Sequence, residues 1–176
     1  PNGVAHPVAV LACLAAGCPC IVLDRDYPED RNRAIIEHSG AKAVVLSPGE
    51  SAPGAITAIR LNMKDTGAAE PLGSIRINPA APDAPAVIIY TSGSTGQPKG
   101  IALSQRALLH RAGQLINSLH LGPADRTLPL GSPCTVAGLL QTLEALLTGA
   151  TLVKANVRAL GIRGVLDLIA HEQVTA

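Results

Sequence analysis

Aromatic side chains are almost absent from this chain of 176 residues, which contains no Phe, no Trp and only two tyrosines, Tyr27 and Tyr90. Proteins that bind single-stranded nucleic acid usually stack the bases on aromatic side chains, and those that bind the phosphate backbone carry a strong positive charge. The formal net charge here is +1. We therefore expect no nucleic acid among the partners, and a core built from aliphatic side chains.

Long apolar runs and metal-binding cysteine patterns are missing as well. No apolar run approaches the roughly 18 residues that a membrane span requires, and the opening segment lacks the basic residues of a secretion signal. The four cysteines, at positions 13, 18, 20 and 134, form no CxxC pair, and no histidine stands at the spacing of a zinc ligand. We expect no membrane partner, no metal site and a cytoplasmic location.

The hydrophobic pattern alternates between helical and extended segments. Helical periodicity marks residues 5–16, 28–39, 104–120, 136–147 and 158–171. Runs typical of strands cover residues 18–23, 43–46, 86–90, 101–103 and 151–154. This alternation predicts an α/β fold in layers, with a mostly parallel sheet flanked by helices. Residues 47–83, which are dense in Pro, Gly and Ala, form a connector with a short strand predicted at 56–61.

The segment between two of these predicted strands, TSGSTGQPKG at residues 91–100, combines hydroxyls, glycines and one lysine. Gly93 and Gly96 permit the close backbone approach that an anion-binding loop needs. The hydroxyls offer rotatable donors, and Lys99 supplies a positive charge. The sequence therefore predicts a site for ATP phosphates formed by Thr91, Ser92, Gly93, Ser94, Thr95, Gly96 and Lys99.

Three better-known glycine motifs do not fit this segment. A Walker loop, GxxxxGK[ST], would need a second glycine where Pro98 stands. The dinucleotide pattern GxGxxG fails because two residues separate Gly93 from Gly96, and the hydrolase elbow GxSxG fails because Ser92 occupies the place of its first glycine. A merely flexible Ser/Gly linker has no use for a Pro-Lys-Gly sequence after a buried strand.

The loop closely resembles the phosphate loop of the adenylate-forming, AMP-binding enzymes, which include nonribosomal peptide synthetase adenylation domains, acyl-CoA synthetases and luciferases. The upstream segment LAAGCPCIVLDRDYPEDRNRAIIEHSGAKAVV is similar to the same family, and YPEDR at residues 27–31 favours the peptide synthetase branch. Downstream, LLTGATLV at residues 146–153 matches the step from the substrate-binding helix to the next strand. The resemblance covers nearly the whole chain, and it is closest to the N-terminal part of an adenylation domain.

This resemblance implies a two-step ligase. A carboxylic or amino acid would attack the α-phosphate of ATP, pyrophosphate would leave, and the acyl adenylate would pass to a phosphopantetheine or coenzyme A thiol. The loop would hold the β- and γ-phosphates, with Mg²⁺ between them, and no residue of the chain is assigned a catalytic role. A degenerate, non-catalytic phosphate-binding or interaction module remains an alternative, whereas an unrelated NTPase is disfavoured by the failed Walker spacing.

One position departs from the family pattern. Adenylation domains for α-amino acids usually carry Phe-Asp-x-Ser, whose aspartate pairs with the substrate ammonium, and this pattern aligns with residues 135–138. The aspartate is replaced by Val136, which we expect to bind the substrate. A substrate without an α-amino group becomes plausible, although Asp125 stays open as a replacement from elsewhere in the segment.

The resemblance also predicts that residues 1–176 are a fragment of one N-terminal adenylation domain. The family's adenine pocket, ribose and magnesium carboxylates and mobile lid domain have no counterpart in these residues. We expect the fragment alone to be inactive, and to self-associate through a surface that truncation exposes. The acid and the acceptor thiol stay undetermined at this point.

Overall fold

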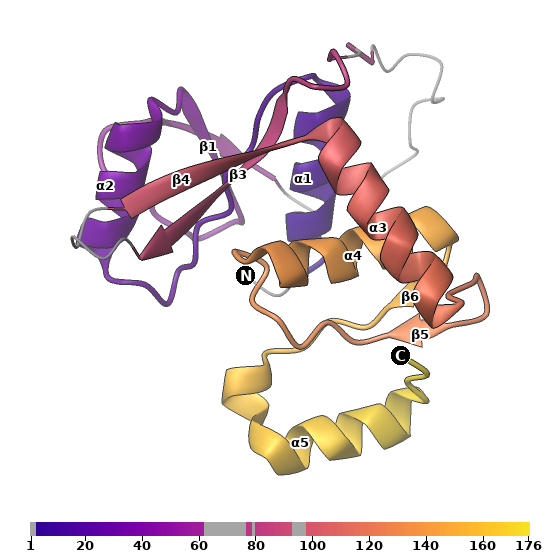
Figure 1. Cartoon of the computed structure of the whole chain (residues 1–176). Helices are drawn as coiled ribbons and strands as arrows, with labels where there is room; N and C mark the ends of the chain where they lie inside the picture. The colour runs from indigo at the N-terminus through magenta and orange to yellow at the C-terminus, as the bar shows by residue number, and fades with distance from the viewer. Residues whose placement is uncertain (1–2, 62–76, 79, 93–97) are drawn as a thin grey trace, which may run out of the picture. The chain divides into compact units, whose positions relative to one another are not determined.

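The computed structural model of the protein describes residues 3–61, 77, 78, 80–92 and 98–176 (Figure 1). These residues form two compact units, Gly3–Leu103 and Ser104–Ala176. Each unit has its own apolar core, and each is described by itself below. The predicted phosphate-binding residues at positions 93–96 lie outside the described residues.

The described residues of the first unit form two helices and four strands. They are α1 (Ala5–Ala15), α2 (Glu29–Ser39), β1 (Ala43–Leu46), β2 (Thr57–Arg60), β3 (Pro85–Ser92) and β4 (Pro98–Ser104). Strands β1 and β2 pair in parallel, and β3 pairs with β4. The predicted strand at 56–61 is thus present as β2, and the core gathers side chains such as Val10, Ile35, Leu46, Val87 and Ile89.

The predicted strand at residues 18–23 is reduced to a single bridge. Cys20 N donates to Ala86 O at 2.9 Å, and Ile88 N donates to Cys20 O at 2.9 Å, which joins Cys20 in parallel to Val87 of β3. The prediction of a full strand was wrong. Pro19, next to Cys20, has no N–H to donate to a ladder, so pairing does not extend toward the N-terminal side.

The Tyr-Pro-Glu-Asp-Arg segment forms the start of α2. Pro28 is the N-cap residue with φ −51° and ψ 139°, and Glu29 and Asp30 occupy the first turn. Negative side chains in a first turn interact favourably with the helix dipole. The guanidinium carbon of Arg31 lies 4.3 Å from the centre of the Tyr27 ring, an arrangement in which a cation is attracted to an aromatic face. These contacts fix the entry of the chain into α2.

The second unit contains three helices and two short strands. They are α3 (Gln105–Leu119), β5 (Arg126–Thr127), α4 (Val136–Thr148), β6 (Thr151–Leu152) and α5 (Val157–Glu172). Strands β5 and β6 pair in parallel, with Arg126 opposite Thr151. On the other edge of β5, Leu128 N donates to Ala176 O at 3.0 Å and Thr175 N donates to Arg126 O at 2.8 Å. The last residues of the chain therefore continue this small sheet.

Helix α4 is the most deeply buried element of the second unit. Its buried side chains include Leu139, Leu140, Thr142 and Leu143, and it packs against α3, β5 and β6. The Thr135 hydroxyl accepts a hydrogen bond from Gly138 N at 3.2 Å and so caps the start of the helix. Such a cap satisfies a backbone donor that the helix itself leaves unpaired.

The ends of the predicted helices are confirmed to within two residues, but α5 is kinked at Gly161, whose backbone (φ 63°, ψ −179°) is not helical. The α/β class is confirmed too, with the strands arranged as three two-stranded sheets whose pairings β1–β2 and β5–β6 are parallel. Helix α3 ends at Leu119, close to the predicted end, and its C-cap residue His120 has φ 53°. A histidine tolerates this left-handed conformation better than most residues do.

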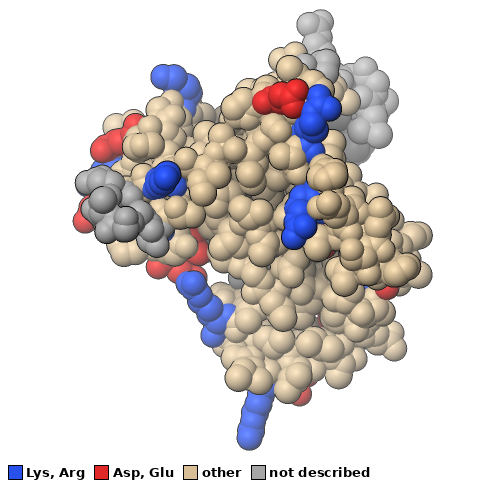
Figure 2. Space-filling model, in the orientation of Figure 1, with Lys and Arg blue, Asp and Glu red and all other residues tan. Residues whose placement is uncertain are grey.

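On the face shown in Figure 2, most of the surface is uncharged, and the Lys and Arg side chains stand apart from one another, some of them beside Asp or Glu. No helix within the described ranges is both long enough and apolar enough to cross a membrane.

We predict that Gly138→Ala destabilises the protein. A Cβ at this position would overlap the backbone oxygen of Ser132 and lie 2.7 Å from that of Gly131. These backbone atoms of the loop before α4 cannot move aside as a flexible side chain can, so the free energy of unfolding should fall by about 1–3 kcal/mol. Urea denaturation followed by circular dichroism measures this change.

Gly113→Ala is the matched control, because Gly113 lies in α3 with no atom within 4 Å of its would-be Cβ. This substitution should raise the free energy of unfolding by about 0.5–1 kcal/mol, since alanine loses less backbone entropy in a helix. Equal effects of the two substitutions would contradict the packing argument.

Candidate functional site

The predicted phosphate loop connects β3 and β4, and Gly100 lets the two strands approach each other beside it. A Cβ on Gly100 would lie 3.1 Å from Cζ of Tyr90 and 3.1 Å from Cγ2 of Ile88. Any larger residue would push the tyrosine ring away from the strand. The glycine therefore positions Tyr90 across β4, next to the loop.

Tyr90 in turn links the end of β3 to the end of α2. Its hydroxyl lies 2.8 Å from Nδ1 of His38, and the two rings meet edge to face with their centroids 5.7 Å apart. Burial raises the pKa of Tyr90, and the hydroxyl of Ser39 opposes this shift. The phenol thus stays neutral and able to hydrogen bond. These contacts hold the strand end from which the loop departs.

The structure brings together two of the predicted phosphate-binding residues, Thr91 and Lys99. Thr91 Oγ1 donates to Lys99 O at 3.5 Å, so the two positions face each other across the paired strands. Both residues are exposed. Of Ser92 only the backbone is described. The phosphate-binding role of all seven residues stays a prediction.

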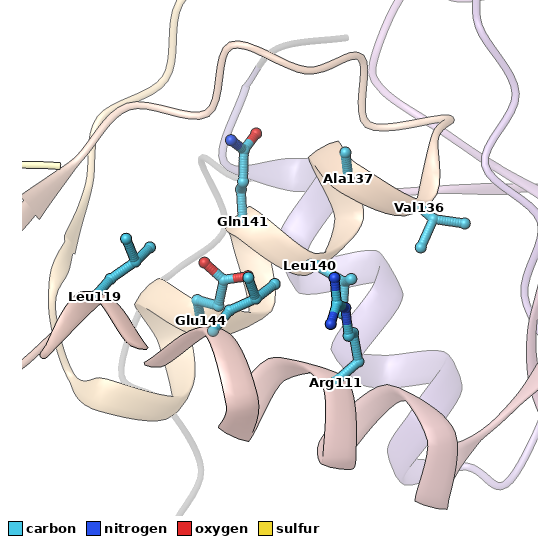
Figure 3. A pocket seen from close by; sticks show the side chains of 8 residues that line it. Arg111, Leu119, Val136, Ala137, Leu140, Gln141 and Glu144 are labelled. Atoms are coloured by element: carbon cyan, nitrogen blue, oxygen red, sulfur yellow. The ribbon is translucent and has the colours of Figure 1, made fainter. Parts of the chain in front are cut away.

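A second feature is a hollow of about 450 Å³ between α3 and α4, both in the second unit (Figure 3). This volume falls within the usual range of small-molecule sites. Val136 lies at the start of α4 with 38% of its surface exposed. The residues that line the hollow are Arg111, Leu115, Leu119, Val136, Ala137, Leu140, Gln141 and Glu144.

Glu144 is the most unusual of these residues. Only 4% of its surface is exposed, and its Oε1 atom has no hydrogen-bond partner. Burial raises the pKa of this carboxyl, and the positive charge of Arg111 opposes the shift. Arg111 donates from Nη1 to Gln114 Oε1 at 3.2 Å. The hollow therefore contains one carboxylate and one guanidinium on an otherwise mostly apolar lining.

The other carboxylate considered from the sequence, Asp125, has a different task. Its side chain accepts hydrogen bonds from Gly122 N at 2.8 Å and from the Thr175 hydroxyl at 2.7 Å. These two bonds hold the pKa of Asp125 below its ordinary value. Asp125 is also not among the residues that line the hollow. These hydrogen bonds indicate that Asp125 stabilises the turn before β5.

Sequence reasoning named Val136, whose substrate-binding role stays a prediction, but it named none of the other residues that line the hollow. Arg111 lies on α3 and Glu144 on α4, so their proximity depends on how the two helices pack. One signal was available, because Glu144 is the only charged residue in the sequence of α4. A single carboxylate in an apolar helix is rarely buried without a specific reason.

Comparison with known proteins identifies the family. A model of the AMP-binding enzyme family matches residues 1–176. The chain belongs to this family. The resemblance that the loop and its flanking segments indicated is thereby confirmed.

Similar curated proteins are nonribosomal peptide synthetases. A probable non-canonical synthetase, CymA of Salinispora arenicola, is 33% identical over 99% of this chain and 2% of its own length. Pyochelin synthetase PchE of Pseudomonas aeruginosa is 33% identical over 87% of the chain and 10% of its own length. The AMP-binding family member described here thus spans only a small part of these relatives.

Solved structures of adenylate-forming enzymes share the fold. The nonribosomal peptide synthetase FmoA3 matches 98% of this chain and 18% of its own, with a TM-score of 0.82 and 28% identity. A malonyl-CoA ligase with methylmalonyl-CoA and AMP bound matches 86% of this chain and 32% of its own, with a TM-score of 0.74 and 26% identity. The fold class predicted from the sequence is therefore that of the N-terminal region of these enzymes.

We predict that the Tyr90–His38 contact stabilises the first unit. Tyr90→Phe removes the hydroxyl and should lower the free energy of unfolding by about 0.5–1.5 kcal/mol, because the imidazole nitrogen then loses its partner. A double-mutant cycle with His38→Ala should show a coupling energy of about the same size. Chemical denaturation of the four proteins measures it.

Tyr27→Phe is the control for this cycle, since the Tyr27 ring meets Arg31 through its face. It should show no coupling to His38→Ala. A coupling energy for Tyr90 no larger than that for Tyr27 would refute the proposed link.

Proposed function

We propose that this chain is part of an ATP-dependent ligase that activates a carboxylic acid as an acyl adenylate, releases pyrophosphate and passes the acyl group to a thiol. The observation that carries the proposal is the family match over residues 1–176, together with the TSGSTGQPKG segment between the paired strands β3 and β4. By itself the chain is proposed to be inactive, because a phosphate loop alone offers too few contacts to offset the cost of association.

Lys99 and Thr91 are the described residues proposed to hold the phosphates. Lys99 is exposed at the start of β4, two residues after position 97 of the loop in the sequence, so its ammonium is available to an anion. The carboxylate of the acid would attack the α-phosphorus of ATP, and the bond from that phosphorus to pyrophosphate would break. The positive charge of Lys99 offsets the negative charge that builds on the leaving pyrophosphate, and the loop orients that group for departure.

Magnesium is proposed to arrive with the nucleotide and to shield the charge between its phosphates. Within the described ranges, no group of three or more His, Cys, Asp or Glu side chains could hold a metal ion. One solved structure with a similar fold is that of O-succinylbenzoate coenzyme A synthetase MenE of Bacillus subtilis in complex with ATP and a magnesium ion. For this chain, phosphate oxygens are proposed as the main ligands, as is usual for Mg²⁺ at nucleotide sites.

The hollow between α3 and α4 is proposed to receive the acid. Val136 stands where α-amino acid members of the family carry an aspartate, and it offers no charge to an ammonium group. An unpaired ammonium in a largely desolvated pocket would cost about 2–5 kcal/mol. We therefore propose a substrate that lacks the α-amino group.

The acceptor thiol is proposed to belong either to a carrier-protein phosphopantetheine or to coenzyme A. Both kinds of relative are represented among the similar proteins, since PchE is a pyochelin synthetase and another relative is a malonyl-CoA ligase. The described residues favour neither acceptor.

We predict that Lys99→Ala strongly impairs carboxylate-dependent ATP–pyrophosphate exchange by the complete enzyme that contains this chain. Loss of a charge-assisted hydrogen bond of about 1.5–3 kcal/mol corresponds to a fall in kcat/KM of roughly 10- to 100-fold. Lys99→Arg should retain most of the activity, and Lys42→Ala, at an exposed lysine outside the loop, should retain all of it. Absence of exchange in the wild-type enzyme with every acid would favour a non-catalytic phosphate-binding module instead.

We also predict that the wild-type enzyme prefers deaminated acids to the corresponding α-amino acids, and that Val136→Asp shifts this preference toward the amino acids by at least about 10-fold. The reason is that a new carboxylate at the start of α4 can pair with the substrate ammonium. Val136→Asn is the control, because it changes polarity and size without adding charge. The same shift in Val136→Asn would show that charge pairing is not the cause.

A further inference from the structure

Glu144 is the feature that the proposed reaction leaves unexplained. It lies just over two helical turns beyond Val136 on α4, both residues line the hollow, and the neighbouring buried residues of the helix are uncharged. A buried carboxylate oxygen without a partner is unfavourable and is expected to have been replaced unless it serves a purpose. Its Oε1 atom has no partner.

The position of Glu144 relative to the hollow bears on this purpose. The residue lines the same hollow as Val136, at the other end of the stretch of α4 that borders it, and Figure 3 shows its side chain on α4 and that of Arg111 on α3. Glu144 lies eight positions after Val136, which corresponds to about 12 Å along a helix. A ligand that begins near Val136 therefore reaches Glu144 only with its far end.

The chemistry of the far end follows from the two charges. An alkyl tail would leave the Glu144 oxygen without a partner. An ammonium group would satisfy that oxygen but would face the positive charge of Arg111. An uncharged group that both donates and accepts hydrogen bonds can donate to Glu144 and accept from Arg111. Hydroxyl and primary amide groups have this property.

We propose that the hollow selects carboxylic acids with a hydroxyl or amide group at the end remote from the reacting carboxylate. Glu144 recognises this group by accepting a hydrogen bond from it. This assignment rests on the proposed adenylating function, because it names the substrate class of the same site. The apolar middle of the hollow, formed by residues such as Leu115 and Leu140, accommodates the chain between the two ends.

The test is ATP–pyrophosphate exchange by the complete enzyme with ω-hydroxy acids of about six to ten carbons and with the unsubstituted acid of each length. The wild-type enzyme should favour the hydroxylated acid of the best length by roughly 10- to 100-fold in kcat/KM, because a site built around a buried polar group rejects an analogue that leaves it unpaired. The ω-amino acid of that length should be a poorer substrate than the hydroxy acid.

Glu144→Leu should abolish this preference through the KM of the acid and leave the KM of ATP unchanged. Glu144→Gln should keep most of the preference, since its amide carbonyl still accepts a hydrogen bond from the substrate. Glu37→Gln makes the same chemical change at an exposed carboxylate of α2 and should have no effect. The wild-type comparison needs no variant, so poor folding of Glu144→Leu would not remove the test.

Two failures are distinguishable. Exchange that proceeds equally well with hydroxylated and unsubstituted acids, or a preference that survives in a folded Glu144→Leu enzyme, overturns the role of Glu144 and leaves the ligase intact. A wild-type enzyme that exchanges pyrophosphate with no acid of any class overturns the proposed function and this assignment together.

Discussion

The burial of α4 is the constraint on which the second unit depends. Helix α3 and the strands β5 and β6 all pack against it, and Leu139 in its first turn has no exposed surface. A helix buried on so many sides can be nearly uniformly apolar without a narrow polar stripe. Its start must then be fixed by other means, and the Thr135 cap and the close contact of Gly138 with the preceding loop provide them. The hollow owes its position to the same packing, because its walls are α3 and α4.

In the first unit, the arrangement of β3, β4 and the end of α2 depends in a comparable way on the contacts of Tyr90. The ring lies over Gly100, and the hydroxyl reaches His38 at the end of α2. These contacts define where β3 and β4 stand relative to each other before the chain turns through the predicted phosphate loop. In a family whose loop must place several donors around one polyphosphate, small displacements of the strand ends weaken catalysis. Aromatic residues are scarce in this chain. The place of one of its two tyrosines beside the loop therefore supports a specific role for that tyrosine in positioning the strand ends.

Much of the fold could be predicted from the sequence because the local signals agree with the final structure. The helices have regular apolar periodicity, and β1 occupies the predicted residues. Where prediction failed, pairing partners decided the result. Residues 18–23 have strand composition, yet only Cys20 finds a partner. Strand β5 has two residues, too few for any pattern, and exists because β6 and the end of the chain pair with it.

The candidate site, like the fold, could be predicted from the sequence only in part. The phosphate loop could be proposed from a contiguous motif, and family comparison supports the resemblance. The hollow could not be proposed, because Arg111 and Glu144 meet only after α3 has packed against α4. A local pattern can indicate that Glu144 is out of place in an apolar helix, but it cannot name the partner. That information lies in tertiary structure.

The two ends of the hollow are proposed to select substrates by one physical rule. At Val136, an ammonium on the wrong substrate would be buried without a counter-charge, so the unsatisfied group would belong to the ligand. At Glu144, a plain alkyl substrate would leave the carboxylate unsatisfied, so that group would belong to the protein. Both penalties come from unpaired polar groups in a desolvated site, which discriminates more sharply than the gain or loss of a methylene does. A helix that presents an apolar residue at one end and a buried carboxylate at the other can therefore distinguish both ends of one acid without any change of fold.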